Sequence, residues 1–453
     1  MALKVVKFGG SSLANAKQVL RAIDIVKADS RRTVVVVSAP GKRHPDDIKI
    51  TDLLYQWYVL VKVRDYAPAY RVWRRIKNRF YDIVTNLGLE LDISHEFVQI
   101  RKNVREGASE DYVASRGEYL MAKIMAKALG YEFMDAKDFI RFNSSPGKNG
   151  RLATFDRYYN EPLTHSLAQM LLANKCVVIP GFYGAMLDGA TIKTFSRNSS
   201  DLSAAIVAAA LNADVFEKFT DVPGIYAASN EFVENPQSIV SATYRELGEL
   251  AIDPNGVFHP EAMYPLQAAR VRTVILNVND PSAPGTIIYP DEQAPKLPSG
   301  KILGINARRG FSAVTLYRTA MNRQIGFGRR ALEVLEHMGI SYDHFPSGRD
   351  TVSLVIETGQ LEGKRERLVE RLIGFCQADE VKIEDEIALI STVGRAMRNT
   401  AGVAARLLGS LAKVDISTRV IDQGATEMNI VVGVANDDCR KAVNAIYDEF
   451  IRE

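Results

Sequence analysis

The sequence predicts an α/β chain in which a mostly parallel sheet, sandwiched by helices, is followed by two smaller α+β units. Three observations support this prediction. Strand and helix patterns alternate through the first part of the chain, several strand patterns are apolar on both faces, and the last third contains an internal repeat. Continuous apolar runs such as "TVVVVSA" are typical of parallel strands whose two faces are both buried.

The composition is that of an ordinary globular protein. The chain has 453 residues, of which 47% are hydrophobic and 25% charged. Its 57 basic and 54 acidic residues give a formal net charge of +3, so nucleic acid and anionic membranes are not indicated as partners. We expect no signal peptide and no membrane span, because a strand begins almost at once and no apolar run is long enough. Three scattered cysteines without CxxC spacing indicate a reduced, cytoplasmic protein.

The strands expected in the first part are short, with helical patterns between most of them. They are Leu3–Lys7, Thr33–Ser38, Glu132–Asp135, Cys176–Pro180, Asp214–Thr220 and Thr273–Asn277. Between about residues 41 and 107 the strand patterns stop, and aromatic and aliphatic side chains recur at helical spacing, which predicts a helical excursion. Arginines in that stretch are interpreted as a solvated face of a helix in preference to a nucleic-acid patch. The proline-rich "YPDEQAPKLPSGK" predicts a linker, placed at 291–301.

Two copies of one pattern follow the linker at a constant offset of 76 residues. This offset places Gly326 on Gly402 and superimposes a helix, a turn and an alternating strand of the two copies. Closing helices are expected near Leu361–Cys376 and Asp437–Ile451. The order strand, helix, strand, strand, helix predicts two ferredoxin-like units. These units are expected over residues 302–385 and 386–453.

The stretch "KFGGSSLA" contains the first residues that could bind a ligand or take part in catalysis. Lys7 ends a strand, and Gly9, Gly10 and Ser11 separate it from a helix expected from about Leu13. Glycines let backbone N–H groups approach an anion, and the helix N-terminus and the lysine add positive charge, which suits a polyphosphate. A tight turn with a serine cap explains the stretch nearly as well, and the Walker A pattern is absent.

Three further segments place charged side chains beside buried elements. In "TFSRNSSD", Arg197 can hold a carboxylate through two parallel hydrogen bonds and Asp201 can pair with an amine, although a capped, salt-bridged helix is an equal alternative. Thr220 and Asp221 follow a buried strand, at the sheet edge where α/β proteins bind ligands. Glu118 lies in a stretch that otherwise resembles a core helix, where its carboxylate either meets an ammonium group or reaches the surface.

Taken together, these motifs resemble those of the aspartate kinases of the amino acid kinase superfamily. The segments "VVKFGGSSLA", "SAPGK…KITDLL", "SRGE", "SRNSSD", "TDVPGIY", "FHPEA" and "NDPSAPGTII" occur in the family's order, and the repeat resembles its paired ACT domains. "NRQIGFGRRA" and "PSGRDT" are similar to stretches of the monofunctional enzymes of low-GC Gram-positive bacteria. The resemblance covers essentially the whole chain. It implies a catalytic domain over 1–290 and two ACT units, with the chain end near Ile451 returning to the first.

The resemblance implies a phosphoryl transfer from ATP to L-aspartate, giving 4-phospho-L-aspartate and ADP. This reaction is the first step toward lysine, threonine, methionine and diaminopimelate. The acceptor carboxylate is ionised at neutral pH, so the reaction needs no general base. Lys7 is implied to neutralise the transferring group and Asp201 to orient Lys7, while Gly9, Gly10 and Ser11 cradle phosphate oxygens.

Substrate contacts are implied at other positions. Arg197 is assigned to a carboxylate of aspartate, Glu118 to its ammonium group, and Thr51 to a hydrogen bond with the same substrate. The nucleotide site is implied at Thr220, Asp221 and Tyr226. Mg²⁺ is expected to be held mainly by phosphates and water, without a dedicated protein site.

The first ACT unit is implied to bind a feedback amino acid, which is lysine, threonine or both together. The implied contacts are Met321, Gly326, Phe327, Gly328, Ser341 and Asp343. Arg349 stands where relatives have a glutamate, so the identity of the effector stays open. Because ACT pairs dimerise in the family, we expect a homodimer or a dimer of dimers.

Several positions depart from the family pattern. Asn198 and Ser199 replace two glycines of the loop before Asp201. Glu231 and Gly256 stand where basic residues are usual, which changes how the nucleotide is held. Lys218 and Arg245 are alternative basic groups for that contact.

Two rival functions come from other classes. The altered loop is compatible with a catalytically impaired regulatory protein that binds amino acids. "GFGRRA" matches GxGxxA, which is typical of NAD-dependent oxidoreductases. However, the second copy of the repeat loses one of these glycines, and the repeating unit is too short for a dinucleotide-binding domain.

Overall fold

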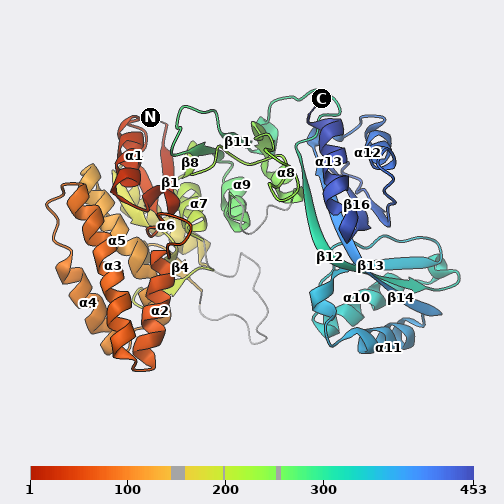
Figure 1. The fold of residues 1–453 in the computed structure, drawn as a ribbon, viewed down its shortest axis with the longest axis horizontal. Coiled ribbons are helices and arrows are strands. Elements are labelled where there is room, and N and C mark those ends of the chain that lie inside the picture. Colours follow the sequence, from red (N-terminus) through yellow and green to blue (C-terminus); the bar gives the residue numbers. More distant parts are fainter. Residues whose placement is uncertain (1, 144–158, 197–198, 251–256, 453) are drawn as a thin grey trace. The chain divides into compact units, whose positions relative to one another are not determined.

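The computed structural model divides the chain into two compact units, which we describe separately (Figure 1). The structure describes residues 2–143, 159–196, 199–250 and 257–452. The first unit comprises Met1–Ile225, Ser238–Tyr244 and Ile252–Ala294, and the second comprises Tyr226–Gln237, Arg245–Ala251 and Pro295–Glu453. Two short segments that precede the linker therefore group with the C-terminal unit.

An eight-stranded sheet organises the first unit. In sheet order its strands are β3 (Glu132–Phe133), β5 (Val177–Pro180), β2 (Val34–Val37), β1 (Lys4–Phe8), β8 (Val215–Thr220), β10 (Arg272–Asn277), β11 (Thr286–Tyr289) and β9 (Ser241–Thr243). The strands from β3 to β10 are parallel, whereas β11 pairs antiparallel with β10 and parallel with β9. All four valines of β2 are buried, as expected for a strand covered on both faces. The mostly parallel sheet is confirmed.

Helices cover this sheet, and a smaller sheet adjoins it. The helices are α1 (Ala16–Lys27), α5 (Glu110–Leu129), α6 (Glu161–Leu172), α7 (Ser200–Ala210) and α9 (Met263–Ala268), whereas α8 (Tyr244–Glu249) belongs, apart from its first residue, to the second unit. Every residue of α7 is buried, as its apolar sequence predicts. The smaller sheet, which the sequence did not indicate, consists of β4 (Arg141–Phe142), β6 (Tyr183–Met186) and β7 (Ile192–Thr194).

The helical excursion is formed by α2 (Ile50–Lys62), α3 (Tyr66–Asn86) and α4 (Ser94–Arg105). With α5 these helices form the orange group in Figure 1. Trp57 and Trp73 join α2 to α3, with ring centroids 4.2 Å apart, and Phe97 of α4 meets Trp73 edge-on at 5.7 Å. Aromatic contacts of this kind bury large apolar areas, so these side chains form the core of the excursion.

The second unit contains the repeat. Its strands are, in sheet order, β13 (Thr351–Glu357), β12 (Gly304–Tyr317), β14 (Glu380–Val393), β16 (Asn429–Ala435) and β15 (Val420–Asp422). Its helices are α10 (Phe327–Met338), α11 (Arg365–Cys376), α12 (Val403–Ala412) and α13 (Cys439–Phe450). Strand β14 begins and ends 76 residues after β12, in agreement with the offset read from the sequence. The two ACT-type α+β units are confirmed as a fold class.

The two copies share one sheet, because β12 and β14 pair antiparallel with each other. The second strand expected in the first copy is reduced to isolated bridges, from His344 to Val355 and from Ser347 to Val352. Pro346 lies between these bridges and has no N–H to donate to a ladder, which explains the interruption. Helix α13 packs against β12, β14 and β16, and no strand follows it among the described residues.

Two further findings concern the helices and the cysteines of the described residues. None of their helices combines the length and apolar character that a membrane crossing requires. Cys176, Cys376 and Cys439 are free thiols.

Candidate active site

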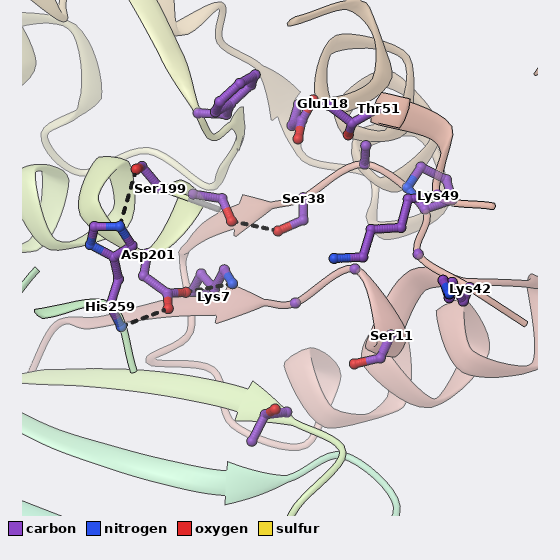
Figure 2. Close-up of a pocket in the computed structure, with 18 of the residues that line it drawn as sticks. Lys7, Ser11, Ser38, Lys42, Lys49, Thr51, Glu118, Ser199, Asp201 and His259 are labelled. Atoms are coloured by element: carbon purple, nitrogen blue, oxygen red, sulfur yellow. Dashed lines mark hydrogen bonds and ion pairs between the residues drawn. The ribbon is translucent and has the colours of Figure 1, made fainter. Parts of the chain in front are cut away.

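A cavity of about 690 Å³ opens at the carboxyl ends of β1, β2 and β8 in the first unit. Segments far apart in the sequence meet there: the loop after β1, the start of α2, the middle of α5, the start of α7 and the turn at Val257. Figure 2 shows charged and hydroxyl side chains pointing into this cavity from several of these elements. Ligands of open α/β sheets bind at this edge.

Two lysines share one carboxylate in the floor of the cavity. Parallel pairing places Lys7 of β1 opposite Lys218 of β8, so both side chains leave the same face of the sheet. Asp201, in the first turn of α7, forms an ion pair with each of these lysines. Its Oδ1 lies 2.5 Å from Lys7 Nζ, and its Oδ2 accepts a hydrogen bond from Lys218 Nζ. Lys218 also donates to the carbonyl oxygen of Val257.

Burial and charge act in opposite directions on this triad. Burial by itself would raise the pKa of Asp201, but the ammonium groups of Lys218 and Lys7 hold that pKa well below its usual value. Burial lowers the pKa of Lys218 to about 8, although Asp201 acts in the opposite direction. Asp201 is therefore a permanent anion at neutral pH, and two cations compete for it.

The loop after β1 approaches a second loop closely. The N–H of Gly41 donates to the carbonyl oxygen of Gly10 at 2.8 Å, and a Cβ on Gly41 would lie 2.6 Å from the Gly10 carbonyl carbon. Gly10 has φ of −63°, so this loop requires glycine for close approach and not for left-handed backbone. The helix expected from Leu13 begins later, at Ala16, because Asn15 caps it through the N–H of Gln18.

A carboxyl group on another wall forms no salt bridge with the residues that the structure describes. Glu118 lies in α5, is 5% exposed, and its Oε2 accepts no hydrogen bond from the described residues. Burial raises its pKa to about 8, against the smaller effect of the Ala39 N–H and of Arg116. Thr51, in the first turn of α2, lines the same cavity. A buried carboxyl with one oxygen unpartnered among the described residues suits a ligand that carries an ammonium group.

The structure brings most of the expected site residues to this cavity. Its lining includes Lys7, Gly9, Gly10, Ser11, Thr51, Glu118, Asp201, Thr220 and Asp221. Tyr226 lines a separate hollow in the second unit, together with Asn230 and Glu234. Arg245, in α8, is not among the residues that line the cavity. Arg197, Asn198 and Gly256 lie outside the described residues.

Sequence reasoning missed several polar groups of the site. Ser38 and Ser200 share a hydrogen bond of 2.7 Å, and His259 Nε2 lies 3.4 Å from the hydroxyl of Ser199 (Figure 2). Burial lowers the pKa of His259, so its ring is neutral at pH 7. Lys218 appeared only as one of two alternatives. The sequence did contain a signal, since "KF" stands at the end of β1 and one residue before the end of β8. In-register pairing stacks Phe8 on Phe219, with ring centroids 5.2 Å apart.

The residues expected to bind an effector lie in the second unit, before and in the first turn of α10 and, for Ser341 and Asp343, just after its end. Met321 and Phe327 belong to the hydrophobic core of the first copy. Gly326, with φ of +80°, occupies the position before α10, and Gly328 lies against the ring of Phe345. The N–H of Ser341 donates to Gln360 Oε1 at 2.8 Å. Asp343 is ion-paired with Arg308 of β12.

Comparison with known proteins agrees with this geometry. Residues 2–277 match the model of the amino acid kinase family, and residues 390–450 match an ACT domain model. The chain is 36% identical to aspartokinase 3 of Bacillus subtilis, over 99% of this chain and 98% of that protein. It is 25% identical to lysine-sensitive aspartokinase 3 of Escherichia coli, over 98% of each. The crystal structure of aspartate kinase from Clostridium acetobutylicum is similar, with a TM-score of 0.86, 39% identity and coverage of 99% of this chain and 100% of that one.

The fold and the cavity thus define a member of the amino acid kinase family, a class that transfers phosphoryl groups to small acceptors. Within that class, the full-length matches and the C-terminal ACT fold show that the chain belongs to the aspartokinases.

Proposed function

We propose that this chain transfers the γ-phosphoryl group of ATP to the side-chain carboxylate of L-aspartate. The observation that carries the proposal is the cavity itself, which has ammonium groups on its floor and, on its wall, a buried carboxyl whose Oε2 has no partner among the described residues. The floor suits a polyphosphate and the wall suits an amino acid. The 36% identity to an aspartokinase over nearly the whole chain supports the same substrates.

The transfer needs no proton. An oxygen of the aspartate β-carboxylate forms a bond to the γ-phosphorus, and the bond from that phosphorus to the β,γ-bridging oxygen breaks. The bridging oxygen keeps the electron pair, which gives an acyl phosphate and ADP. Lys7, held by Asp201, lies where it can neutralise charge on the phosphoryl oxygens. In this proposal the backbone of Gly9, Gly10 and Ser11 faces the phosphates.

The acceptor is held by the opposite wall in this proposal. The carboxylate of Glu118 binds the α-ammonium of aspartate, and the hydroxyl of Thr51 donates to one of its carboxylates. Arg197 is assigned to a carboxylate on the strength of the sequence resemblance alone. Holding both reactants in one cavity supplies much of the rate enhancement, because it removes the entropic cost of their encounter.

The nucleotide is assigned to the end of β8. Thr220 and Asp221 line the cavity there, and Tyr226 remains a prediction from the sequence. We propose that Mg²⁺ enters with the nucleotide, held by phosphate oxygens and water. The described residues bring together no group of three histidine, cysteine or acidic side chains that could hold a metal ion. When bound, Mg²⁺ would neutralise part of the phosphate charge.

Regulation is assigned to the second unit. We propose lysine, threonine or both as effectors, and the name of the lysine-sensitive relative supports lysine. The proposed contacts are those around the start of α10, where the buried Met321 and Phe327 can contribute through their backbone groups. Feedback inhibition requires that the effector bind one conformation more tightly than another. We also propose a homodimer formed through the ACT units, or a dimer of dimers, a cytoplasmic location, and a place at the start of lysine and threonine synthesis.

The test is a panel of ATP-dependent reactions with aspartate, glutamate and their analogues, followed by ADP release. We expect rapid ADP release with aspartate and little with glutamate. Formation of an acyl phosphate is checked by trapping with hydroxylamine. If ADP release does not depend on any amino acid, the chain is not a kinase of this type, and a regulatory amino-acid-binding protein becomes the better interpretation.

A further inference from the structure

The floor of the cavity contains one more lysine than the mechanism above uses. Lys218 is 6% exposed and lies in register with Lys7 on the neighbouring parallel strand. We propose that Lys218 is a second catalytic lysine, whose ammonium group binds a non-bridging oxygen of the transferring γ-phosphate. This proposal deepens the proposed function and depends on it for the identity of the nucleotide.

The first argument is the number of hydrogen-bond donors. A lysine ammonium has three N–H groups. Two of those of Lys218 have acceptors, namely Asp201 Oδ2 and the carbonyl oxygen of Val257. The third has no acceptor among the residues that the structure describes, and the side chain lines the cavity. A phosphate oxygen on the side of Gly9 and Gly10 would satisfy it.

The second argument is the balance of charge. Two buried ammonium groups face a single buried carboxylate, because Lys7 and Lys218 both pair with Asp201. Removing charges from water is costly unless each is compensated, so a floor with one uncompensated positive charge favours an anion. A phosphate group supplies that charge where the mechanism needs it.

The groups around Lys218 come from five segments. Lys7 lies on β1 and Asp201 on α7, and Asp221 follows β8 itself. The turn at 257–259 contributes the ring of Phe258, with its centroid 5.5 Å from Nζ, and the neutral His259. On the other side β10 places the apolar Ile275 in register. Of these described residues, Asp201 and Asp221 have acidic side chains; Asp201 is shared with Lys7, and Asp221 is exposed to solvent.

This environment also gives Lys218 a distinctive titration. Burial lowers its pKa to about 8, so in the free protein it loses its charge just above neutral pH. An arginine at the same position would stay protonated throughout this range. The pH dependence of kcat/KM for ATP, measured at saturating aspartate, reports the ionisation of the free site.

The experiment compares the wild-type protein with Lys218→Met and Lys218→Arg. We expect the wild-type kcat/KM for ATP to fall above about pH 8. Lys218→Met should lower kcat by about 100-fold or more, the usual loss when one preorganised donor to a developing charge is removed. Lys218→Arg should keep measurable activity and lose the decline above pH 8.

Lys4→Met is the matched control. Lys4 is also a largely buried lysine in this sheet, ion-paired with Glu217 and Asp29 but outside the cavity. We expect it to lower thermal stability while leaving the pH profile unchanged. If the alkaline limb arose from a group other than Lys218, Lys218→Arg would keep it, and that result overturns the proposal.

A binding measurement separates this proposal from the proposed function. Lys218→Met should weaken binding of a non-hydrolysable ATP analogue at least tenfold and leave AMP binding unchanged, in the absence of aspartate. Equal affinities of the wild type and the variant for the ATP analogue overturn the role of Lys218, whatever the acceptor is. If the wild type does not phosphorylate aspartate but the difference in binding is observed, the proposed acceptor is wrong. The contact between Lys218 and the phosphate is then still supported.

Discussion

Glu118 provides the sharpest test of the aspartate site, because its protonation should couple to substrate binding. Its carboxyl lies in the middle of α5, and burial raises its pKa to about 8. The groups that face it are the N–H of Ala39, the guanidinium of Arg116 and the more distant Lys7. In the empty protein at pH 7 the carboxyl is therefore mostly protonated and cannot pair with an ammonium group.

The expected change in the KM for aspartate follows from the pKa of Glu118. A rise from 4.5 to about 8 means that ionising Glu118 in the empty cavity costs about 5 kcal/mol more than in water, at ~1.4 kcal/mol per pH unit. Roughly a tenth of the molecules are ionised at pH 7 and half at pH 8. Since aspartate binds the ionised form in this mechanism, its KM should fall about fivefold from pH 7 to pH 8.

The assay is the KM for aspartate between pH 6.5 and 8.5 at saturating MgATP. Calorimetry at pH 7 in buffers of different ionisation enthalpy should show nearly one proton released per aspartate bound. Glu118→Gln should raise the KM by at least about tenfold and make it independent of pH. Glu96→Gln is the control, because Glu96 pairs with Lys123 outside the cavity. A wild-type KM that is flat with pH, or no proton release, would refute the assignment of the ammonium site to Glu118.

The remaining predictions concern stability, chemistry and regulation. Glu118→Gln should unfold at a higher temperature than the wild type at pH 9 but not at pH 4, because a raised pKa destabilises the folded state as the pH rises through about 8. Lys7→Ala should lower turnover by orders of magnitude with the circular dichroism spectrum unchanged, and near-normal activity would exclude its assigned role. Gly41→Ala should cost about 1–3 kcal/mol of stability in chemical denaturation, since its Cβ would lie 2.6 Å from Gly10, whereas Gly409→Ala, with open space around it, should not destabilise the protein. Kinase activity should fall when lysine, threonine or both are added. Activity that none of these additions changes would exclude the assignment of the second unit as the site of feedback inhibition.

The local sequence was sufficient to predict structure or site residues wherever a single segment carries its own reactive groups or its own periodicity. The apolar residues of α7 require burial on every side, and the structure buries all of them. The offset of 76 residues predicted the relation between β12 and β14, because equivalent side-chain patterns fold into equivalent elements. "SSD" indicated that Asp201 can pair with an amine, the family resemblance assigned it to Lys7, and the structure joins the two in an ion pair.

Tertiary structure alone decided how distant segments combine. The register of β1 with β8 places Lys218 beside Lys7, and the "KF" that both strands contain does not by itself specify that register. The raised pKa of Glu118 arises because neighbouring segments exclude water from it, and desolvation is a property of the whole packed environment. The direct pairing of β12 with β14 merges two repeats into one sheet, which periodicity within each copy cannot indicate. The sequence thus determines which groups are present, while packing determines which of them meet and what charge they carry.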